Sequence, residues 1–212
     1  MIKQGKLIAI EGPDGAGKST QIRMLQEVCP NAVFTREPGG TPYAERIRAL
    51  IFEGEEATPQ ALFMLFWAAR MEHLQRLILP AIREGKTVVT DRFDLSTFAY
   101  QLRGQFNTRE LDALFWQIRQ SQVVPFVMPY YIYLDIPVEI AIERLKKREG
   151  EVTHFDTRPI DFHERVRDGG HMFLGKMNVL REGFYHIIDA CRSADIVHQE
   201  IVKTLNIIHA AE

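Results

Sequence analysis

A glycine-rich stretch near the start of the chain, IEGPDGAGKST (residues 10–20), contains the residue types that bind phosphate. Gly12, Gly17, Lys18 and Ser19 match the spacing G-x-x-x-x-G-K-[ST]. Glycines let successive backbone N–H groups turn inward and form an anion-binding nest, to which a following helix adds its positive end. We expect Lys18 to reach the β- and γ-phosphates of a nucleotide and Ser19 to join a Mg²⁺ shell. The alternative is a glycine-rich strand-to-helix turn that binds nothing.

A carboxylate follows a second apolar run, TVVTD (residues 87–91). Asp91 ends this run and Arg92 follows it directly. A carboxylate at the end of a strand beside a phosphate loop can hold Mg²⁺, directly or through water. The alternative is a surface ion pair.

Phe66 and Arg70 lie four residues apart in a long segment of helical period, so they share a helix face. An aromatic plane beside a guanidinium could stack on a base and bind a phosphate. The alternative is that Phe66 packs in the core, because the segment is rich in Phe, Leu and Trp.

Short apolar runs alternate with longer segments of helical period along the whole chain. Strands are predicted at residues 6–11, 32–35, 87–91, 130–135 and 184–189, and helices at 18–28, 41–53, 58–84, 108–122, 137–147, 160–182 and 194–209. This alternation predicts an α/β fold with a parallel sheet covered by helices on both faces. Ligands of such folds bind at the carboxyl ends of the strands, where the polar residues above fall.

Composition limits the class of protein. A length of 212 residues with 46% hydrophobic content fits one domain over residues 1–212. The net charge of −2 argues against a general nucleic-acid binder. Two cysteines far apart in the sequence, no signal-peptide pattern and no apolar stretch of membrane-spanning length predict a cytoplasmic protein with no membrane partner.

Five stretches, in order, resemble the thymidylate kinases of the P-loop nucleoside monophosphate kinase group: IEGPDGAGKST, TREPGGT, LFWAAR, DRFDLSTFAYQ and YLDIPVEIAIERLKKR. The resemblance implies a three-layer P-loop NTPase-type fold with a five-stranded parallel sheet and a short lid at about residues 144–160. It also implies ATP-dependent phosphorylation of dTMP to dTDP in dTTP biosynthesis. ATP with Mg²⁺ would be the phosphoryl donor, and the family is commonly homodimeric.

The resemblance also assigns roles to matching residues. It implies donor phosphate contacts by Gly12, Pro13, Asp14, Gly15, Ala16, Gly17, Lys18, Ser19, Thr20 and Arg144. It implies acceptor contacts by Asp14, Arg36, Glu37, Pro38, Phe66, Arg70, Arg92, Ser96, Thr97, Tyr100 and Gln101. Asp14 would meet the 3′-hydroxyl, Phe66 would stack on the pyrimidine, Arg70 and Arg92 would bind the acceptor phosphate, and Tyr100 would exclude a 2′-hydroxyl. Thr97 and Tyr100 could instead pack or cap, and Asp14 could be a solvated loop acid.

Phosphoryl transfer needs positive charge around the γ-oxygens. Some family members carry an arginine in the phosphate loop where this chain has Gly15, which points to a lid arginine here. Arg144, Arg148 and Arg158 are the candidates, and Arg148 joins Asp14, Lys18 and Arg92 as a predicted catalytic residue. The alternative is a solvated basic helix end. The segment also departs from the family, because Pro159 and Ile160 replace its Arg-x-Glu arrangement.

Three other functions remain open. A pocket for dTMP could accept dUMP, because one methyl group is worth only about 1–3 kcal/mol. A deoxynucleoside kinase would need a carboxylate base beside the sugar hydroxyl, and a Glu-Arg-Ser pattern rather than the Asp91-Arg92 pair found here. A P-loop switch or assembly ATPase would hydrolyse ATP without any acceptor.

Overall fold

The computed structural model describes residues 5–53, 57–105, 109–147, 157–180 and 184–210. Its strands are β1 (Leu7–Glu11), β2 (Val33–Arg36), β3 (Val88–Asp91), β4 (Tyr130–Asp135) and β5 (Phe184–Asp189). They form one five-stranded sheet in the order β2-β3-β1-β4-β5, and every pair is parallel. The predicted α/β fold of the P-loop NTPase type is confirmed.

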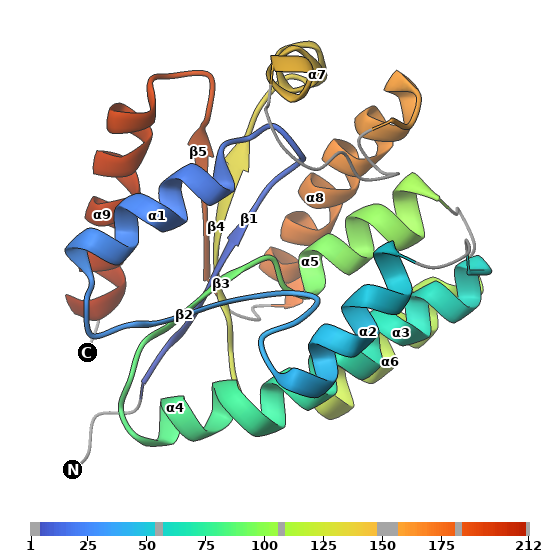
Figure 1. The fold of residues 1–212 in the computed structure, drawn as a ribbon, viewed down its shortest axis with the longest axis horizontal. Coiled ribbons are helices and arrows are strands. Elements are labelled where there is room, and N and C mark those ends of the chain that lie inside the picture. The colour runs from blue at the N-terminus through green and yellow to red at the C-terminus, as the bar shows by residue number, and fades with distance from the viewer. Residues whose placement is uncertain (1–4, 54–56, 106–108, 148–156, 181–183, 211–212) are drawn as a thin grey trace.

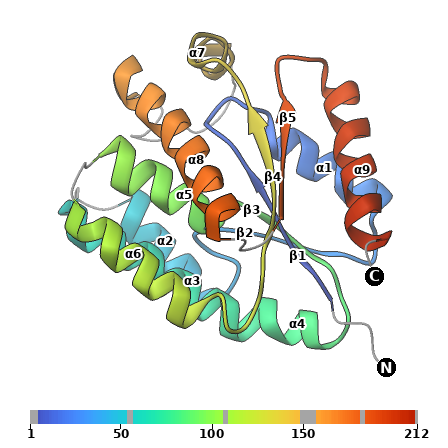
Figure 2. The same ribbon diagram turned by 180° about the vertical axis from the view of Figure 1, so that it is seen from behind.

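Helices cover both faces of this sheet (Figure 1 and Figure 2). The helices are α1 (Lys18–Val28), α2 (Pro42–Phe52), α3 (Pro59–His73), α4 (Leu79–Arg83), α5 (Asp94–Thr97), α6 (Arg109–Gln122), α7 (Val138–Lys147), α8 (Ile160–Leu180) and α9 (Ala194–Ala210). In the part of the chain that the structure describes, no helix combines the length and apolarity needed to cross a membrane.

The alternation of side chains along β1 divides the core into two halves. Leu7 and Ala9 pack into one apolar cluster with α2, α3, α6 and α8. Ile8 and Ile10 pack into the other, with α1 and α9. Because both faces of β1 are fully buried, its carboxyl end and the phosphate loop that follows are held from both sides.

The prediction of one continuous helix over residues 58–84 was wrong in the middle of that range. It consists of α3, a π-helical turn at Leu74–Ile78, and α4. Pro80 lies in the first turn of α4 and has no N–H to donate to the preceding turn. A widened turn just before a proline accommodates that missing hydrogen bond.

A helix that the sequence analysis did not assign follows β3. It begins as α5 at Asp94 and continues as a π-helical turn over Phe98–Gly104. This segment contains Ser96, Thr97, Tyr100 and Gln101, so it positions four of the predicted acceptor residues.

The predicted lid at 144–160 lies only partly within the described chain. Helix α7 ends at Lys147 and α8 begins at Ile160. Arg148, one of the predicted catalytic residues, lies outside the described residues, as does the rest of 148–156.

Candidate functional site

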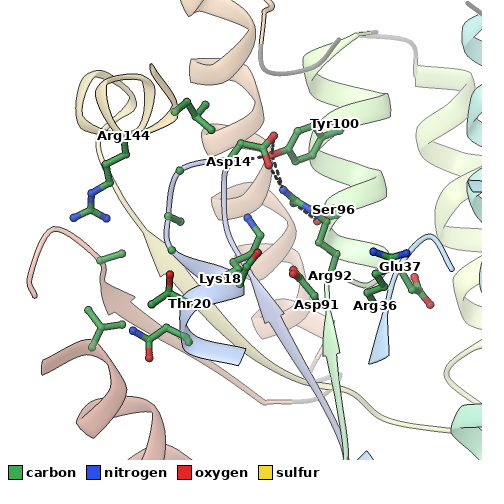
Figure 3. A pocket seen from close by; sticks show the side chains of 18 of the residues that line it. Asp14, Lys18, Thr20, Arg36, Glu37, Asp91, Arg92, Ser96, Tyr100 and Arg144 are labelled. Atoms are coloured by element: carbon green, nitrogen blue, oxygen red, sulfur yellow. Dashed lines mark hydrogen bonds and ion pairs between the residues drawn. The ribbon is translucent and has the colours of Figure 1, made fainter. Parts of the chain in front are cut away.

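A cavity of about 770 Å³ opens at the carboxyl ends of β1 and β3 (Figure 3). The phosphate loop forms its floor, with Asp14 to Gln21 all lining it. One side is lined by Arg144 and Leu145 of α7 and by Arg192, Ser193 and Ala194 before and at the start of α9. The opposite side is lined by residues that follow β2 and β3, including Glu37, Arg92 and Tyr100. The two predicted halves of the site therefore share one cavity.

The phosphate loop holds Lys18 in a buried position over its own backbone. The Lys18 ammonium donates to the carbonyls of Gly12 at 2.9 Å and Pro13 at 2.8 Å. Burial, followed by the nearby charge of Arg92, lowers the pKa of Lys18 to about 8. The ammonium is thus held where α1 begins, close to the N–H groups that would receive a phosphate.

Two glycines of this loop have different reasons to be glycine. Gly17 caps α1 in the left-handed region, with φ of 91°, and an added Cβ would meet nothing within 4 Å. Gly15 also has a positive φ, of 82°, but its Cβ would lie 2.4 Å from the carbonyl oxygen of Ala141 in α7. A side chain at position 15 is therefore excluded by the helix that carries Arg144, so the loop has no room for an arginine at this position.

Asp14, Arg92 and Tyr100 form a tight polar cluster between the two sides of the cavity. The Arg92 guanidinium pairs with the Asp14 carboxylate and donates to the Tyr100 hydroxyl at 3.2 Å. The Tyr100 hydroxyl donates to Asp14 Oδ2 at 2.8 Å. Burial alone would raise the pKa of Asp14, but the charges of Arg92 and Lys18 lower it below its ordinary value. Asp14 is therefore a charged, anchored group rather than the solvated loop acid of the alternative.

Arg92 adopts a backbone conformation that non-glycine residues rarely adopt, with φ of 69°. Its side chain is held by Ser96 Oγ at 2.8 Å and by the Gly12 carbonyl at 3.2 Å. The turn after it is held by Glu11, whose carboxylate accepts from the Phe93 N–H at 2.7 Å and the Ser96 N–H at 3.2 Å. Glu11 thus fixes the unusual turn that directs Arg92 into the cavity.

Glu11 was missed by the sequence analysis. It is fully buried, and desolvation raises its pKa to about 7 despite the nearby Arg92. Its signal in the sequence was an acidic residue at the end of the otherwise apolar run LIAIE (residues 7–11).

Asp91 and Ser19 both line the cavity beside the phosphate loop. Asp91 Oδ1 is buried and has no hydrogen-bond partner among the described residues. A carboxylate oxygen and a hydroxyl are the ligands that Mg²⁺ prefers, so these residues fit the predicted ion. The described residues contain no cluster of three or more His, Cys, Asp or Glu side chains that could hold a metal without a nucleotide.

Arg70 lies behind the cavity wall rather than in it. It is 2% exposed, and it donates to Glu37 Oε2 at 2.8 Å and to Thr97 Oγ1 at 2.9 Å. Thr97 is likewise buried and does not line the cavity, whereas Glu37 does. In this structure Arg70 and Thr97 lie behind Glu37 and support the side of the cavity that follows β2 and β3.

The other predicted acceptor residues line the cavity itself: Arg36, Pro38, Phe66, Ser96, Tyr100 and Gln101. Phe66 is half-buried, so it both packs against the core and presents a surface to the cavity. Gln101 Nε2 is buried without a hydrogen-bond partner among the described residues, and can therefore serve a ligand. Arg36 pairs with Glu45 at 3.0 Å at the exposed rim.

Two further arginines line the cavity that the sequence analysis missed. Arg48 of α2 donates to the Pro38 carbonyl at 3.0 Å on the acceptor side. Arg192 lines the same side of the cavity as Arg144 and pairs with Glu200. No motif marks either residue, because each reaches the cavity through the packing of its helix or loop. Arg158 does not line the cavity.

Comparison with known proteins gives consistent results. A family model described as thymidylate kinase matches residues 10–201. A thymidylate kinase of Pelotomaculum thermopropionicum is 37% identical over 207 residues, which cover 94% of this chain and 92% of that protein. A thymidylate kinase of Vibrio vulnificus is 41% identical over 175 residues, covering 78% of this chain and 80% of that protein.

A solved structure agrees with the sequence matches. The crystal structure of thymidylate kinase from Ehrlichia chaffeensis superposes with a TM-score of 0.73 at 29% sequence identity. The match covers 96% of this chain and 99% of that one. The chain described here belongs to the thymidylate kinase family, a group of nucleoside monophosphate kinases.

Proposed function

We propose that this enzyme transfers the γ-phosphoryl group of ATP to dTMP, giving dTDP and ADP, for dTTP synthesis. The observation that carries the proposal is the shared cavity, in which Arg92 and Asp14 join the phosphate loop to the acceptor side. An acceptor phosphate held by Arg92 would lie beside the γ-phosphate held over Lys18. A switch or assembly ATPase has no need of this second half.

In the transfer step, an oxygen of the dTMP phosphate attacks the γ-phosphorus. The bond from that phosphorus to the bridging oxygen breaks, and ADP leaves with the electron pair. Lys18 and the loop N–H groups stabilise the donor oxygens, and Arg92 neutralises the acceptor phosphate. Asp91 and Ser19 would hold Mg²⁺, which supplies further charge neutralisation when bound. No side chain needs to act as a strong general base.

Acceptor selection rests on the wall opposite the lid. Phe66 offers an aromatic face for the pyrimidine, and Gln101 offers an unpaired amide for its edge. Asp14 and the Tyr100 ring would lie against the sugar, where the ring leaves no room for a 2′-hydroxyl. Arg36, Glu37, Pro38 and Ser96 complete this side, and Arg70 and Thr97 support it from behind.

The donor side needs one more positive charge, which we assign to the lid. Arg144 lines the cavity on α7 and donates to the Cys191 carbonyl at 3.4 Å. Arg148 follows four residues later in the sequence and stays a proposal, together with the lid at 144–160. Closure of such a segment would exclude water and prevent hydrolysis of ATP.

A panel of nucleoside monophosphates tests the proposed function. ADP formation is measured with ATP, Mg²⁺ and dTMP, dUMP, dCMP, UMP or thymidine. We expect dTMP to give the highest kcat/KM, and dUMP to be lower by about 10-fold or more, as one methyl contact allows. Turnover with thymidine but not dTMP would indicate a deoxynucleoside kinase, and hydrolysis independent of any acceptor would indicate a switch.

We also propose that the enzyme works as a cytoplasmic homodimer. Phe63 and Trp67 lie in the core of the protomer, so they do not supply an interface. Exposed apolar side chains on α2 and α3 could form the dimer interface instead: Tyr43, Leu50 and Met64. Sedimentation equilibrium measures the state, and a Leu50→Asp variant that is monomeric would support this surface.

A further inference from the structure

Five side chains, four of them buried and Thr35 half-buried, form a hydrogen-bonded network on the side of the cavity proposed to bind the acceptor. They are Thr35 at the end of β2, Glu37 just after it, Arg70 and His73 of α3, and Thr97 of α5. Glu37 is its centre, because both carboxylate oxygens are used: Oε2 accepts from Arg70 Nε at 2.8 Å and Oε1 contacts His73 Nδ1 at 3.1 Å. Glu37 also lines the cavity, so the network ends at the cavity surface.

His73 is fixed on both sides of its ring. A carboxylate can only accept a hydrogen bond, so Nδ1 carries the hydrogen that is donated to Glu37. The other ring nitrogen, Nε2, lies 2.7 Å from Thr35 Oγ1. The ring is fully buried, and a Cβ added at Gly40 would lie only 2.5 Å from Nε2, so the loop after Pro38 packs directly over it.

Arg70 is held by the Glu37 carboxylate, which His73 also contacts. Its Nε and Nη2 donate to Glu37 and Thr97, and its guanidinium carbon lies 4.8 Å from the Trp67 ring centre and 5.2 Å from that of Phe93. Nη1 has no hydrogen-bond partner among the described residues. The position of that one unpaired nitrogen therefore depends on the Glu37 carboxylate, whose second oxygen is held by His73.

We infer that His73 is a positioning residue of the acceptor site, acting through Glu37. It holds the Glu37 carboxylate in the rotamer that lines the cavity, and through Glu37 it holds the Arg70 guanidinium that supports this side of the cavity from behind. The inference rests on the proposed function, because it assigns the network to binding of a nucleoside monophosphate. His73 contacts no substrate itself, and the donor half of the cavity does not depend on it.

Two substitutions of the same residue separate positioning from packing. In His73→Asn the amide N–H occupies the place of Nδ1 and keeps the bond to Glu37. In His73→Gln the longer amide occupies the place of Nε2, keeps the contact to Thr35 and leaves Glu37 Oε1 without a partner. Gln is also closer in size to histidine, so it is the matched control for packing.

The two variants should differ in acceptor binding alone. We expect His73→Gln to raise KM for dTMP by about tenfold and to weaken dTMP binding by calorimetry by a similar factor, as expected for an unpaired buried carboxylate oxygen. KM for ATP should stay within about twofold. His73→Asn should keep KM for dTMP within about threefold of the native value. Melting temperatures of both variants are measured alongside.

Either of two results would overturn the inference: equal KM values for dTMP in the Asn and Gln variants, or parallel losses for ATP and dTMP. Should both variants fail to fold, the near-isosteric Thr35→Val variant decides. It replaces the hydroxyl beside Nε2 by a methyl group, and it should raise KM for dTMP by about threefold without changing KM for ATP. An unchanged KM for dTMP in that variant would also reject it. Failure of the proposed function is separate, since it would appear as no dTMP turnover or binding in the native enzyme.

Discussion

Individual charged residues at this site are each held by several neighbours. Asp14 and Arg92 are shared between the phosphate loop, the turn after β3 and the helix that carries Tyr100. Such a group loses little entropy when substrate binds, because its side chain is already ordered. At the proposed site, the charged groups of Asp14 and Arg92 are thus ordered before either nucleotide binds.

Loss of the phosphate-loop lysine should abolish most turnover without unfolding the chain. Lys18→Ala removes the buried ammonium that would contact the β- and γ-phosphates, and we expect kcat to fall by at least ~10². The measurement is dTMP-dependent ADP formation, together with the melting temperature. Lys86→Ala is the matched control, because Lys86 lies on the exposed surface, where it pairs with Glu84. Native turnover in the Lys18 variant would reject the phosphate-loop assignment.

Glu11 should make stability depend on pH in a direction unusual for a carboxylate. Its pKa in the folded chain is raised from 4.5 to about 7, mainly by burial. A raised pKa means that the folded state binds the extra proton, so this contribution is present below pH 4.5 and is lost as pH rises through about 7. The full effect would be on the order of 3 kcal/mol.

The comparison with Glu11→Gln isolates that contribution. The glutamine oxygen can still accept from the Phe93 and Ser96 N–H groups, but the side chain does not titrate. Urea unfolding at several values between pH 5 and pH 8 gives the free energy of unfolding of both proteins. The stability difference should shift in favour of the variant as pH rises. A constant difference across the range would show that Glu11 has an ordinary pKa.

At the scale of elements, α8 packs against β4 through a close contact that only a small residue allows. In α8, a Cβ added at Gly170 would lie 2.4 Å from the Tyr133 hydroxyl oxygen and 2.7 Å from two carbons of the same ring. Tyr133 is buried in β4, so its rigid ring cannot move aside easily. Gly175 of the same helix is exposed, and its Cβ would meet nothing within 4 Å.

This pair of glycines gives opposite predictions for one substitution. Gly175→Ala should stabilise the protein by about 0.5–1 kcal/mol, because alanine restricts the unfolded chain and suits a helix. Gly170→Ala should destabilise it by about 1–3 kcal/mol, because overpacking outweighs the same gain. Chemical unfolding of the two variants and the native chain measures both. Stabilisation by Gly170→Ala would mean that α8 and β4 are less closely packed than described.

The same scale explains which elements were predictable. Strands such as β1 and β3 were readable because both faces are buried, which gives continuous apolar runs. The helix from Asp94 was not, because its polar residues Asp94, Ser96 and Thr97 are buried by specific partners rather than arranged on a solvent face. The interruption at Leu74–Ile78 depends on one residue, Pro80, within a segment whose apolar spacing is otherwise that of a continuous helix.

For the whole molecule, the phosphate loop and most of the cavity lining could be predicted, because sequence motifs determine the local backbone conformation there. Residues such as Glu11, Arg48 and His73 were not predicted, because their positions depend on contacts with residues elsewhere in the sequence. Arg70 was predicted as a direct ligand, yet its placement behind Glu37 depends on how α3 packs against the end of β2. The residue types of a site can thus be read from motifs, whereas the groups that support them are set by tertiary packing.

The whole-molecule consequence is that one compound should occupy both halves of the cavity. A bisubstrate mimic that joins adenosine to thymidine through phosphates can span the phosphate loop, with its two bases on the Arg144 and Phe66 sides. At 100 times its dissociation constant, a single-site ligand stabilises the native state by about 3 kcal/mol, or roughly 5–10 °C in a chain of this length. The linked compound should reach that shift at far lower concentration than dTMP or ATP alone.

Inhibition kinetics distinguish a shared cavity from two separate sites. The mimic should compete with both ATP and dTMP, because it fills the places of both. Shortening the phosphate linker until it cannot pass over Lys18 should remove competition against one substrate while keeping it against the other. If the full-length mimic competed with only one substrate, donor and acceptor would bind apart. Arg92 and Asp14 could not then link donor and acceptor sites within one cavity.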